Sequence, residues 1–361
     1  MPNYMYSDFE DCGFIYSKTE RVRHIYQYLY DPDNLLHCIH KSQQRKHRNR
    51  AVIKFNENFY ENMDNLYWML RNEEYKPGPL RKRKIYEPKE RLLKIPPYNP
   101  DRIVDHCVVS VVEPILMQSF IAHTYSCIKG RGIHGCMEDI VAAVKRDPEG
   151  TRYALIMDVH KYYDNIDHTV LKSKYRRKIG DHQMLGIMDA IVDCNGENKG
   201  LPIGRYTSQM FGNFYLSDYG HFALEVLHVH YLFIYMDNIV ILGSDKERLH
   251  WVFTRSAMHL ATHDHLELNP IWQVFPIAKR DLDHVGFRIS PNDVRLRKGI
   301  LLRFFKKLNK TRKEHVLLCE NDIKHAYPSE YGWLTHCSPQ HKEFLINKII
   351  SDNGTKNHQT A

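Results

Sequence analysis

The sequence predicts an α+β fold in which helices pack on an antiparallel sheet. In the middle of the chain, residues 153–157 form a short apolar run typical of a buried strand, and residues 231–242 form a predicted hairpin with a polar tip. Amphipathic helices are expected between these two segments and after the hairpin, before a further strand at 272–277. The order strand, helix, helix, hairpin, helix, strand is typical of helices packed on an antiparallel sheet.

The first part of the chain predicts helices around one basic hairpin. Residues 56–72 should form one amphipathic helix that ends at the Pro/Gly-rich breaker 76–79. Its apolar side chains recur at helical spacing, at Phe59, Met63, Leu66, Met69 and Leu70. Two extended runs, 83–86 and 92–95, flank a charged turn and predict the hairpin. Residues 101–119 are apolar at helical spacing and predict a buried helix.

The second half of the chain predicts more helices and short strands. One helix should begin near Asp167, and a long helix should follow residues 200–204. One face of that long helix carries Phe211, Tyr215, Phe222 and Val226. The helix after the hairpin carries Leu249, Val252, Phe253, Ala257 and Leu260 on its apolar face. A strand is expected at 284–289, and residues 300–350 are basic and mostly helical.

Length and charge suggest a multi-part protein with a polyanionic partner. The chain has 361 residues, 43% of them hydrophobic, which predicts two or three packed subdomains. Lysine and arginine number 51 against 43 acidic residues, giving a net charge of +8. The basic residues gather in three clusters: Lys41, Arg45, Lys46, Arg48 and Arg50; residues 81–84; and residues 303–313. Each cluster alone fits a solvated surface, but three of them with aromatic residues between them favour nucleic acid.

The cysteines and the hydropathy pattern indicate the cell compartment. Eight cysteines are scattered without a C-x-x-C pair, which predicts a reduced, cytoplasmic protein. The first thirty residues lack the apolar core of a signal peptide, and no window approaches the apolar length of about 18 residues that a spanning helix needs. We therefore expect no membrane partner.

Two aspartates have a context that suggests a metal site. Asp158 ends an apolar strand, and Asp237 lies between two apolar strands. A carboxylate at the end of a buried strand is costly unless it meets a cation or a hydrogen-bond donor. A single aspartate of this kind is more often a turn or cap residue, but two on strands that could be adjacent suit Mg²⁺, which binds a few carboxylates together with phosphate oxygens.

The order of several motifs resembles reverse transcriptases. The palm motifs of that family resemble Asp158-Val-His-Lys-Tyr-Tyr163, Gly204-Arg-Tyr-Thr-Ser-Gln209 and Tyr235-Met-Asp-Asn238. Fingers and primer-grip motifs are matched by Glu87-Pro-Lys-Glu-Arg91, Asp101-Arg-Ile-Val-Asp105 and His284-Val-Gly-Phe-Arg288. The resemblance covers about residues 30–340.

Within the family, the second palm motif resembles the enzymes of diversity-generating retroelements. It contains Ile203-Gly204 and ends in Ser208-Gln209, where most bacterial relatives have Gln-Gly and Ser-Pro. The segments 86–89, 202–204 and 272–274 are similar to that group too. Some reverse transcriptases of antiphage defence share this resemblance, so the biological role stays open between the two.

The resemblance implies a two-metal nucleotidyl transfer. Asp158 and Asp237 would be catalytic metal ligands, and the Val159 carbonyl would add a contact to one of two Mg²⁺ ions, for which Mn²⁺ can substitute. Tyr163 would be the aromatic gate beneath the sugar that excludes a 2′-hydroxyl; the alternative for Tyr163 is a core aromatic.

The resemblance also implies nucleotide-binding residues. Lys84 and Arg91 would meet the incoming triphosphate, with Lys89 as a rival for the lysine role. Gly204 would let the backbone approach the nucleotide or template. Ser208 and Gln209 would contact the template side of the pocket.

A last group of residues would hold the primer and template. Met236 would lie under the primer terminus, and Gly286 and Phe287 would help hold the primer. The basic helical stretch 303–313, with Arg303, Lys306 and Lys307, would track the nucleic-acid backbone, so affinity should fall with salt.

The sequence departs from the family at two places. Asn238 stands where the third palm motif normally has a second aspartate, so this catalytic position offers an amide oxygen without a negative charge. Engineered inactivation and natural divergence both explain Asn238. The stretch 269–273 lacks the lysine that protonates pyrophosphate in many relatives.

The resemblance implies a right-hand polymerase. Its parts would be an N-terminal extension at 1–30, fingers with the start of the palm at 31–150, and the palm at 151–290. A short helical thumb at 291–350 and a polar tail at 351–361 would complete it.

The implied partners are nucleic acids and nucleotides. They are an RNA template, which could be a dedicated noncoding RNA, a DNA primer or product, and dNTPs. A small basic accessory protein or a second reverse transcriptase is a further expected partner.

Two other hypotheses stay open. Asn238 favours a nucleic-acid-binding scaffold of reverse-transcriptase ancestry that has lost catalysis. A generic basic RNA-binding protein is the second, although it leaves the ordered motifs unexplained.

Overall fold

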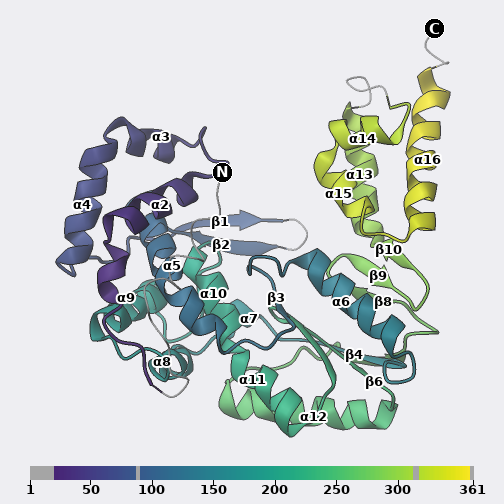
Figure 1. The fold of residues 1–361 in the computed structure, drawn as a ribbon, viewed down its shortest axis with the longest axis horizontal. Helices are drawn as coiled ribbons and strands as arrows, with labels where there is room; N and C mark the ends of the chain where they lie inside the picture. Colours follow the sequence, from purple (N-terminus) through teal and green to yellow (C-terminus); the bar gives the residue numbers. More distant parts are fainter. Residues whose placement is uncertain (1–19, 87–89, 312–316, 358–361) are drawn as a thin grey trace. The chain divides into compact units, whose positions relative to one another are not determined.

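The computed structural model describes residues 20–86, 90–311 and 317–357 (Figure 1). The chain forms two compact units that interleave along the sequence. Unit 1 takes residues up to Ile121 together with His160–Tyr219 and His259–Glu267. Unit 2 takes Ala122–Val159, Gly220–Met258 and residues from Leu268 onward. These units do not coincide with the expected contiguous segments, so the division into fingers, palm and thumb stays a prediction.

Unit 2 contains the predicted sheet. Five strands lie in the order β3-β5-β6-β4-β7. Their bounds are β3 (Thr124–Tyr125), β4 (Tyr153–Asp158), β5 (Tyr231–Tyr235), β6 (Asn238–Gly243) and β7 (Gln273–Pro276). All neighbouring pairs are antiparallel except β3 and β5, which are parallel. The strand ending in Asp158, the hairpin and the mixed α+β fold class are therefore confirmed.

The pairing of β4 with β6 decides which side chains share a face. Ala154 is paired with Leu242, Ile156 with Val240, and Asp158 with Asn238. Residues directly opposite in an antiparallel pair project on the same side of the sheet. The four apolar residues of these pairs pack in or against a hydrophobic core that includes Met137 and Ile140 of α6 (Ile133–Arg146). Asp158 and Asn238 thus lie at the end of this face of the β4–β6 pair, whose other members are apolar.

A small second sheet in unit 2 corrects one prediction. Residues 284–289 were expected to form one strand, but the structure has β8 (Leu282–His284) and β9 (Phe287–Ile289), joined by Val285-Gly286 and extended by β10 (Val294–Leu296). Both turn residues have positive φ, +42° at Val285 and +93° at Gly286. The turn escaped prediction because valine at such a φ is uncommon, and a single glycine in an apolar run is a weak turn signal.

The C-terminal part of unit 2 is helical, as predicted. Its helices are α13 (Lys298–Thr311), α14 (Glu320–Ala326), α15 (Pro328–Leu334) and α16 (Pro339–Asn357). Helix α16 continues through residues 351–357, which were expected to belong to the polar tail. Residues 358–361 of that tail, and residues 1–19 of the N-terminal extension, lie outside the described residues.

Unit 1 begins with helices around a buried central helix. After the short turn η1 (Tyr26–Leu29) come α2 (Pro32–Gln43), α3 (Arg50–Glu57), α4 (Phe59–Arg71), η2 (Tyr98–Arg102) and α5 (Ile103–Met117). Helix α5 confirms the predicted buried helix. The single helix expected at 56–72 is wrong at its start, because Asn58 has φ −126° and ψ 53° and separates α3 from α4. The basic hairpin is confirmed as β1 (Arg81–Ile85) and β2 (Arg91–Ile95).

The remaining helices show one further correction. They are α7 (Tyr162–Asn165), α8 (His168–Arg176), α9 (His182–Val192), η3 (Asp193–Asn195), α10 (Tyr206–Tyr215), α11 (Ser217–His221), η4 (Phe222–Val226) and α12 (Lys246–His263). The helix from near Asp167 is confirmed, since the Asp167 side chain caps α8. The long helix after 200–204 is divided into α10, α11 and η4, because the backbone leaves regular α-helix at Leu216 and again at Phe222. Among the described residues, no helix has the length and hydropathy needed to cross a bilayer.

Candidate active site

The first predicted site residues lie at one end of the β4–β6 pair in unit 2. Strand β4 ends at Asp158, which is directly opposite Asn238, the first residue of β6. Both side chains are partly exposed, whereas Met157 and Ile239 beside them are fully buried. The sheet register therefore brings a carboxylate and an amide together where the apolar face reaches solvent.

Asp237 lies in the two-residue turn between β5 and β6. Tyr235 pairs with Asn238, which leaves Met236 and Asp237 as the turn. Met236 is buried and has φ +54°, a left-handed conformation that non-glycine residues adopt at a cost. The Val159 N–H donates a hydrogen bond to the Asp237 carbonyl oxygen at 3.0 Å. This bond ties the turn to the end of β4, so Asp158 and Asp237 belong to the same end of the sheet.

Two amide side chains contact these carboxylates. Asn269 donates its backbone N–H to the Asp158 carbonyl oxygen at 2.7 Å, and its Nδ2 lies 3.4 Å from Asp158 Oδ2. Asn238 Nδ2 donates to Asp237 Oδ1 at 3.3 Å. Asn269 was not predicted as a site residue, because nothing local in the sequence connects it with Asp158 more than 100 residues away. Both amides stabilise a carboxylate by hydrogen bonding without adding a charge.

The donor set at this end of the sheet fits a divalent cation. Two partly exposed carboxylates offer hard oxygen ligands, and Mg²⁺ characteristically combines one or two carboxylates with substrate phosphates and water. In the part of the chain that the structure describes, no group of three or more His, Cys, Asp or Glu side chains could hold a metal. Since Asn238 is neutral, a cation here would rely on Asp158 and Asp237. The Val159 side chain is buried, and metal contact through its carbonyl stays a prediction.

In unit 1, two adjacent tyrosines of α7 differ in their surroundings. Tyr162 is buried, and its hydroxyl donates to the Gly212 carbonyl oxygen of α10 at 2.5 Å. Tyr163 is only partly buried, and its carbonyl oxygen accepts a hydrogen bond from the Leu201 N–H at 2.8 Å. Tyr162 is thus the core aromatic of the pair, and the role of Tyr163 at a sugar stays a prediction.

The basic hairpin carries the two residues predicted to meet a triphosphate. Lys84 and Arg91 are exposed, and Lys84 Nζ lies 2.9 Å from Glu90 Oε1. Lys82 and Lys94 are directly opposite each other in the hairpin, an arrangement of like charges that an anion would relieve. The rival Lys89 lies outside the described residues.

Gly204 lies against the same hairpin. The Lys94 N–H donates to the Ile203 carbonyl oxygen at 2.9 Å, and a Cβ at Gly204 would be 3.0 Å from the Lys94 carbonyl oxygen. With φ +129° as well, this position requires glycine. The close backbone approach that explains Gly204 is therefore to strand β2, and an approach to a nucleotide or template stays a prediction.

The two residues expected on the template side differ in exposure. Ser208 is buried, and its Oγ donates to the Pro202 carbonyl oxygen at 2.9 Å. Gln209 is exposed. Of the two, Gln209 has the accessibility that a template contact needs.

A buried ionic cluster explains the motif Asp101-Arg-Ile-Val-Asp105. The Arg205 guanidinium binds Asp105 Oδ1 at 2.7 Å and lies 3.3 Å from Asp101 Oδ1, and all three side chains are fully buried. The Tyr75 hydroxyl donates to Asp101 Oδ1 at 3.0 Å. Burial raises the pKa of Asp105, and the guanidinium opposes that shift. Arg205, which was not predicted as a site residue, anchors the chain next to Gly204.

The residues predicted to hold the primer lie in unit 2. A Cβ added at Gly286 would lie 2.8 Å from both Ile300 Cδ1 and Trp333 Cζ3, so the turn needs glycine for packing. Phe287 is fully buried in the core. On α13, Phe304 and Leu308 face the core, whereas the predicted backbone-tracking residues are exposed: Arg303, Lys306 and Lys307. Lys307 forms an ion pair with Glu330 at 2.6 Å.

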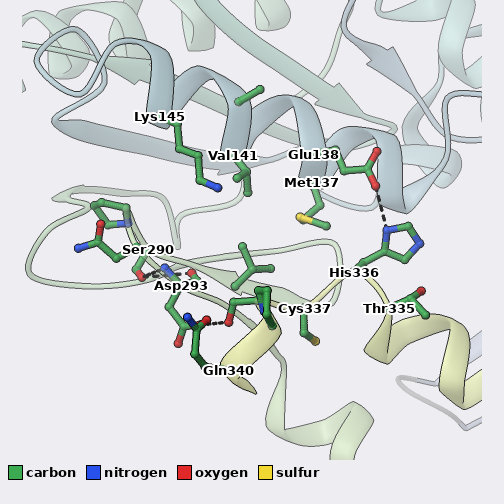
Figure 2. Close-up of a pocket in the computed structure, with 16 residues that line it drawn as sticks. Met137, Glu138, Val141, Lys145, Ser290, Asp293, Thr335, His336, Cys337 and Gln340 are labelled. Carbon is green, nitrogen blue, oxygen red and sulfur yellow. Dashed lines mark hydrogen bonds and ion pairs between the residues drawn. The ribbon is translucent and has the colours of Figure 1, made fainter. Parts of the chain in front are cut away.

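Figure 2 shows a separate pocket in unit 2. Its volume is about 590 Å³. It lies between α6, the β9–β10 turn and the segment that joins α15 to α16. At its edge, His336 Nδ1 lies 2.9 Å from Glu138 Oε1. None of the predicted site residues lines it.

Comparisons with known proteins give distant similarities. No family model matches the chain. Protein YkfC of Escherichia coli (strain K12) is 25% identical over 167 residues, which cover 43% of this chain and 42% of YkfC. The group II intron-encoded protein LtrA of Lactococcus lactis subsp. cremoris is 27% identical over 168 residues, which cover 44% of this chain and 27% of LtrA. The match thus spans less than half the length of either relative.

Among solved structures, two telomerases are similar at low identity. Telomerase from Candida albicans, in complex with a TWJ fragment of telomeric RNA, has a TM-score of 0.49 at 10% identity, covering 81% of this chain and 62% of that chain. Apo telomerase from Candida tropicalis, truncated from the C-terminal domain, has a TM-score of 0.45 at 13% identity, covering 66% of this chain and 60% of that chain.

Proposed function

We propose that this protein is built as a reverse transcriptase, an RNA-directed DNA polymerase that uses two-metal nucleotidyl transfer. The observation that carries the proposal is the meeting of Asp158 and the Asp237 turn at one end of the sheet, linked by the Val159–Asp237 backbone hydrogen bond. Oxygen ligands of this kind suit Mg²⁺ in the presence of a nucleoside triphosphate. The distant likeness to a group II intron-encoded protein and the order of the motifs in the sequence both support the family.

In this proposal the residues have separate tasks. Asp158 and Asp237 would hold the metal, which when bound lowers the pKa of the primer 3′-hydroxyl and neutralises charge on the leaving pyrophosphate. Lys84 and Arg91 on the exposed hairpin would neutralise the triphosphate, and Tyr163 would face the sugar. The exposed cations of α13 would bind the nucleic-acid backbone, so affinity would fall steeply with salt. Fingers, palm and thumb arranged as a right hand are part of the same proposal.

A second function is favoured by one specific observation. Asn238 is the residue directly opposite Asp158, where a carboxylate would add negative charge for the metal. With an amide there, the chain fits a nucleic-acid-binding scaffold of reverse-transcriptase ancestry that has lost catalysis. The reverse transcriptase predicts that a carboxylate at position 238 is sufficient for DNA synthesis, whereas the scaffold predicts that it is not.

The deciding experiment is primer extension by Asn238→Asp on a poly(rA) template with an oligo(dT) primer and Mg²⁺ or Mn²⁺. We expect extension to rise by about 100-fold or more over the unchanged chain, because charge at the reacting centre is the largest catalytic contribution. The matched control is Asp158→Asn/Asn238→Asp, which should not extend the primer. If Asn238→Asp binds RNA but does not extend the primer, the result would favour the scaffold. If it neither binds RNA nor extends the primer, the result would count against both the reverse transcriptase and the scaffold.

The biological setting follows from the product. The retroelement role predicts cDNA with scattered errors at template adenines, whereas the antiphage role predicts simple repeats or fixed copies of a noncoding RNA. Sequencing the DNA and RNA that copurify with Asn238→Asp distinguishes these two roles. It also identifies the template.

A further inference from the structure

Gly212 is a glycine in the interior of a buried helix, where glycine is unfavourable relative to alanine. Its neighbours in α10, Phe211, Phe214 and Tyr215, are buried apolar side chains of the kind that normally fill such a helix. The φ of Gly212 is not in the left-handed range, so the backbone does not require glycine. The reason for the missing side chain must therefore lie in what packs against it.

The atoms that pack against Gly212 belong to Tyr163. A Cβ added at Gly212 would lie 3.3 Å from Tyr163 Oη and 3.5 Å from both Tyr163 Cε1 and Cζ, and these are the three nearest atoms. The first distance is tighter than an ordinary van der Waals contact, so even one methyl group would displace the hydroxyl end of the ring. The missing side chain thus gives room to one aromatic ring.

The backbone around Tyr163 is fixed, so its ring is the part that would move. The Leu201 N–H binds the Tyr163 carbonyl oxygen at 2.8 Å, and the adjacent Tyr162 hydroxyl binds the Gly212 carbonyl oxygen at 2.5 Å. The second bond joins α7 to α10, and the first joins α7 to the segment that precedes α10. A side chain at position 212 would then push the Tyr163 ring away from α10 by a few tenths of an ångström.

We propose that Gly212 is a positioning residue that sets the depth of the Tyr163 ring and thereby tunes selection between deoxyribose and ribose. The inference rests on the proposed function for the role of Tyr163 at the sugar. The contact itself depends only on the packing of α7 against α10. Gly212 does not touch the substrate and acts through the position of the tyrosine.

The functional test compares single-nucleotide incorporation of dTTP and UTP in the Asn238→Asp background. Gly212→Ala should raise KM for dTTP more than it lowers kcat and should change the dTTP/UTP preference by about fivefold or more, because a shift of about 1 kcal/mol corresponds to that factor. In the background of Tyr163→Val, which removes the ring, Gly212→Ala should leave the preference unchanged. A Gly212→Ala effect that is equal for both nucleotides, or that persists without the ring, would overturn the proposal.

A stability test decides the contact without any catalysis. Gly212→Ala should lower the melting temperature of the full chain, and the loss should disappear in the Tyr163→Val background. The matched control is Gly186→Ala in α9, an exposed helical position with nothing within 4 Å of the added Cβ, which should raise the melting temperature by about 2 °C. If Gly212→Ala behaves like Gly186→Ala, Gly212 does not position the ring. If Asn238→Asp fails to incorporate any nucleotide, the proposed function fails, and this melting cycle still decides whether Gly212 positions Tyr163.

Discussion

Two pairs of aspartates in this chain have contrasting surroundings. Asp101 and Asp105 are fully buried around the Arg205 guanidinium in unit 1. Asp158 and Asp237 are partly exposed at the end of β4 and in the β5–β6 turn of unit 2, with amide groups of Asn269 and Asn238 beside them. The first pair is matched by an internal cation, whereas the second leaves carboxylate surface accessible to a cation from solution.

A buried carboxylate that is paired with a cation and a partly exposed carboxylate are expected to contribute differently to this protein. A carboxylate buried with a guanidinium has its charge compensated inside the fold, and its contribution is to stability. A carboxylate at the exposed end of an apolar strand contributes little to packing, so its loss should change chemistry more than folding. Both aspartate motifs stand out in the sequence, but only the structure shows that one pair is buried with a cation and the other is partly exposed.

The largest expected effect is on the buried cluster. Arg205→Met should lower the free energy of unfolding by about 3–5 kcal/mol, because Asp101 and Asp105 would stay buried without the cation that compensates them. Urea denaturation followed by circular dichroism measures this loss. A loss below about 1 kcal/mol would show that the buried cluster does not contribute substantially to stability.

The second effect tests the exposed pair. In the Asn238→Asp background, Asp158→Asn should lower primer extension by at least about 100-fold, equivalent to about 2.7 kcal/mol of transition-state stabilisation. Because Asp158 is partly exposed, the same change should alter the free energy of unfolding by less than about 1 kcal/mol. Primer extension and urea denaturation, measured in parallel on one preparation, check the predicted loss of activity and the predicted small change in stability. A large stability loss would place Asp158 with the structural carboxylates.

The third effect concerns a buried ionisable group that folding keeps neutral. His284 in β8 is buried, and burial, followed by the nearby Arg297, lowers its pKa to about 3. In the unfolded chain His284 takes up a proton as the pH falls below about 6.5, whereas in the folded protein it does so only near pH 3. Between these two pH values the unfolded state binds more protons, so the free energy of unfolding decreases as the pH falls. His284→Gln should remove up to about 2 kcal/mol of the loss between pH 6.5 and pH 5.

Urea midpoints of the two proteins across this pH range provide the measurement. Equal pH slopes would show that His284 titrates normally in the folded protein. At pH 7.5 the two proteins should differ only by the packing change, which provides the internal control.

The smallest effect is expected at an exposed ion pair. Arg177 pairs with Asp218 in unit 1, with side-chain exposures of 60% and 40%. Arg177→Ala should lower the free energy of unfolding by less than about 1 kcal/mol, and high salt should remove most of the difference. Comparison with Arg205→Met at two salt concentrations sharpens the contrast between buried and exposed arginines. A salt-independent loss of several kcal/mol at Arg177 would contradict it.

Much of the fold was predictable because its signals are local. The apolar run before Asp158, the hairpin around Asp237-Asn238 and the buried helix α5 each follow from residue types at the spacing of one strand or helix. The failures share a cause. The breaks at Asn58 and Leu216 and the turn at Val285-Gly286 carry only weak breaker or turn residues, so tertiary packing decided them.

The candidate site divides in the same way. The sequence predicted Asp158 and Asp237 as a pair because each stands at the end of an apolar strand, and the order of the surrounding motifs, by resemblance to reverse transcriptases, marked Asn238 as the place of a missing carboxylate. Only the tertiary structure showed that Asn238 is directly opposite Asp158, that Arg205 binds Asp105 across 100 residues, and that Gly212 makes room for Tyr163. Strand register and packing between distant segments are set by the folded chain as a whole, and no local pattern encodes which distant partner a side chain will meet.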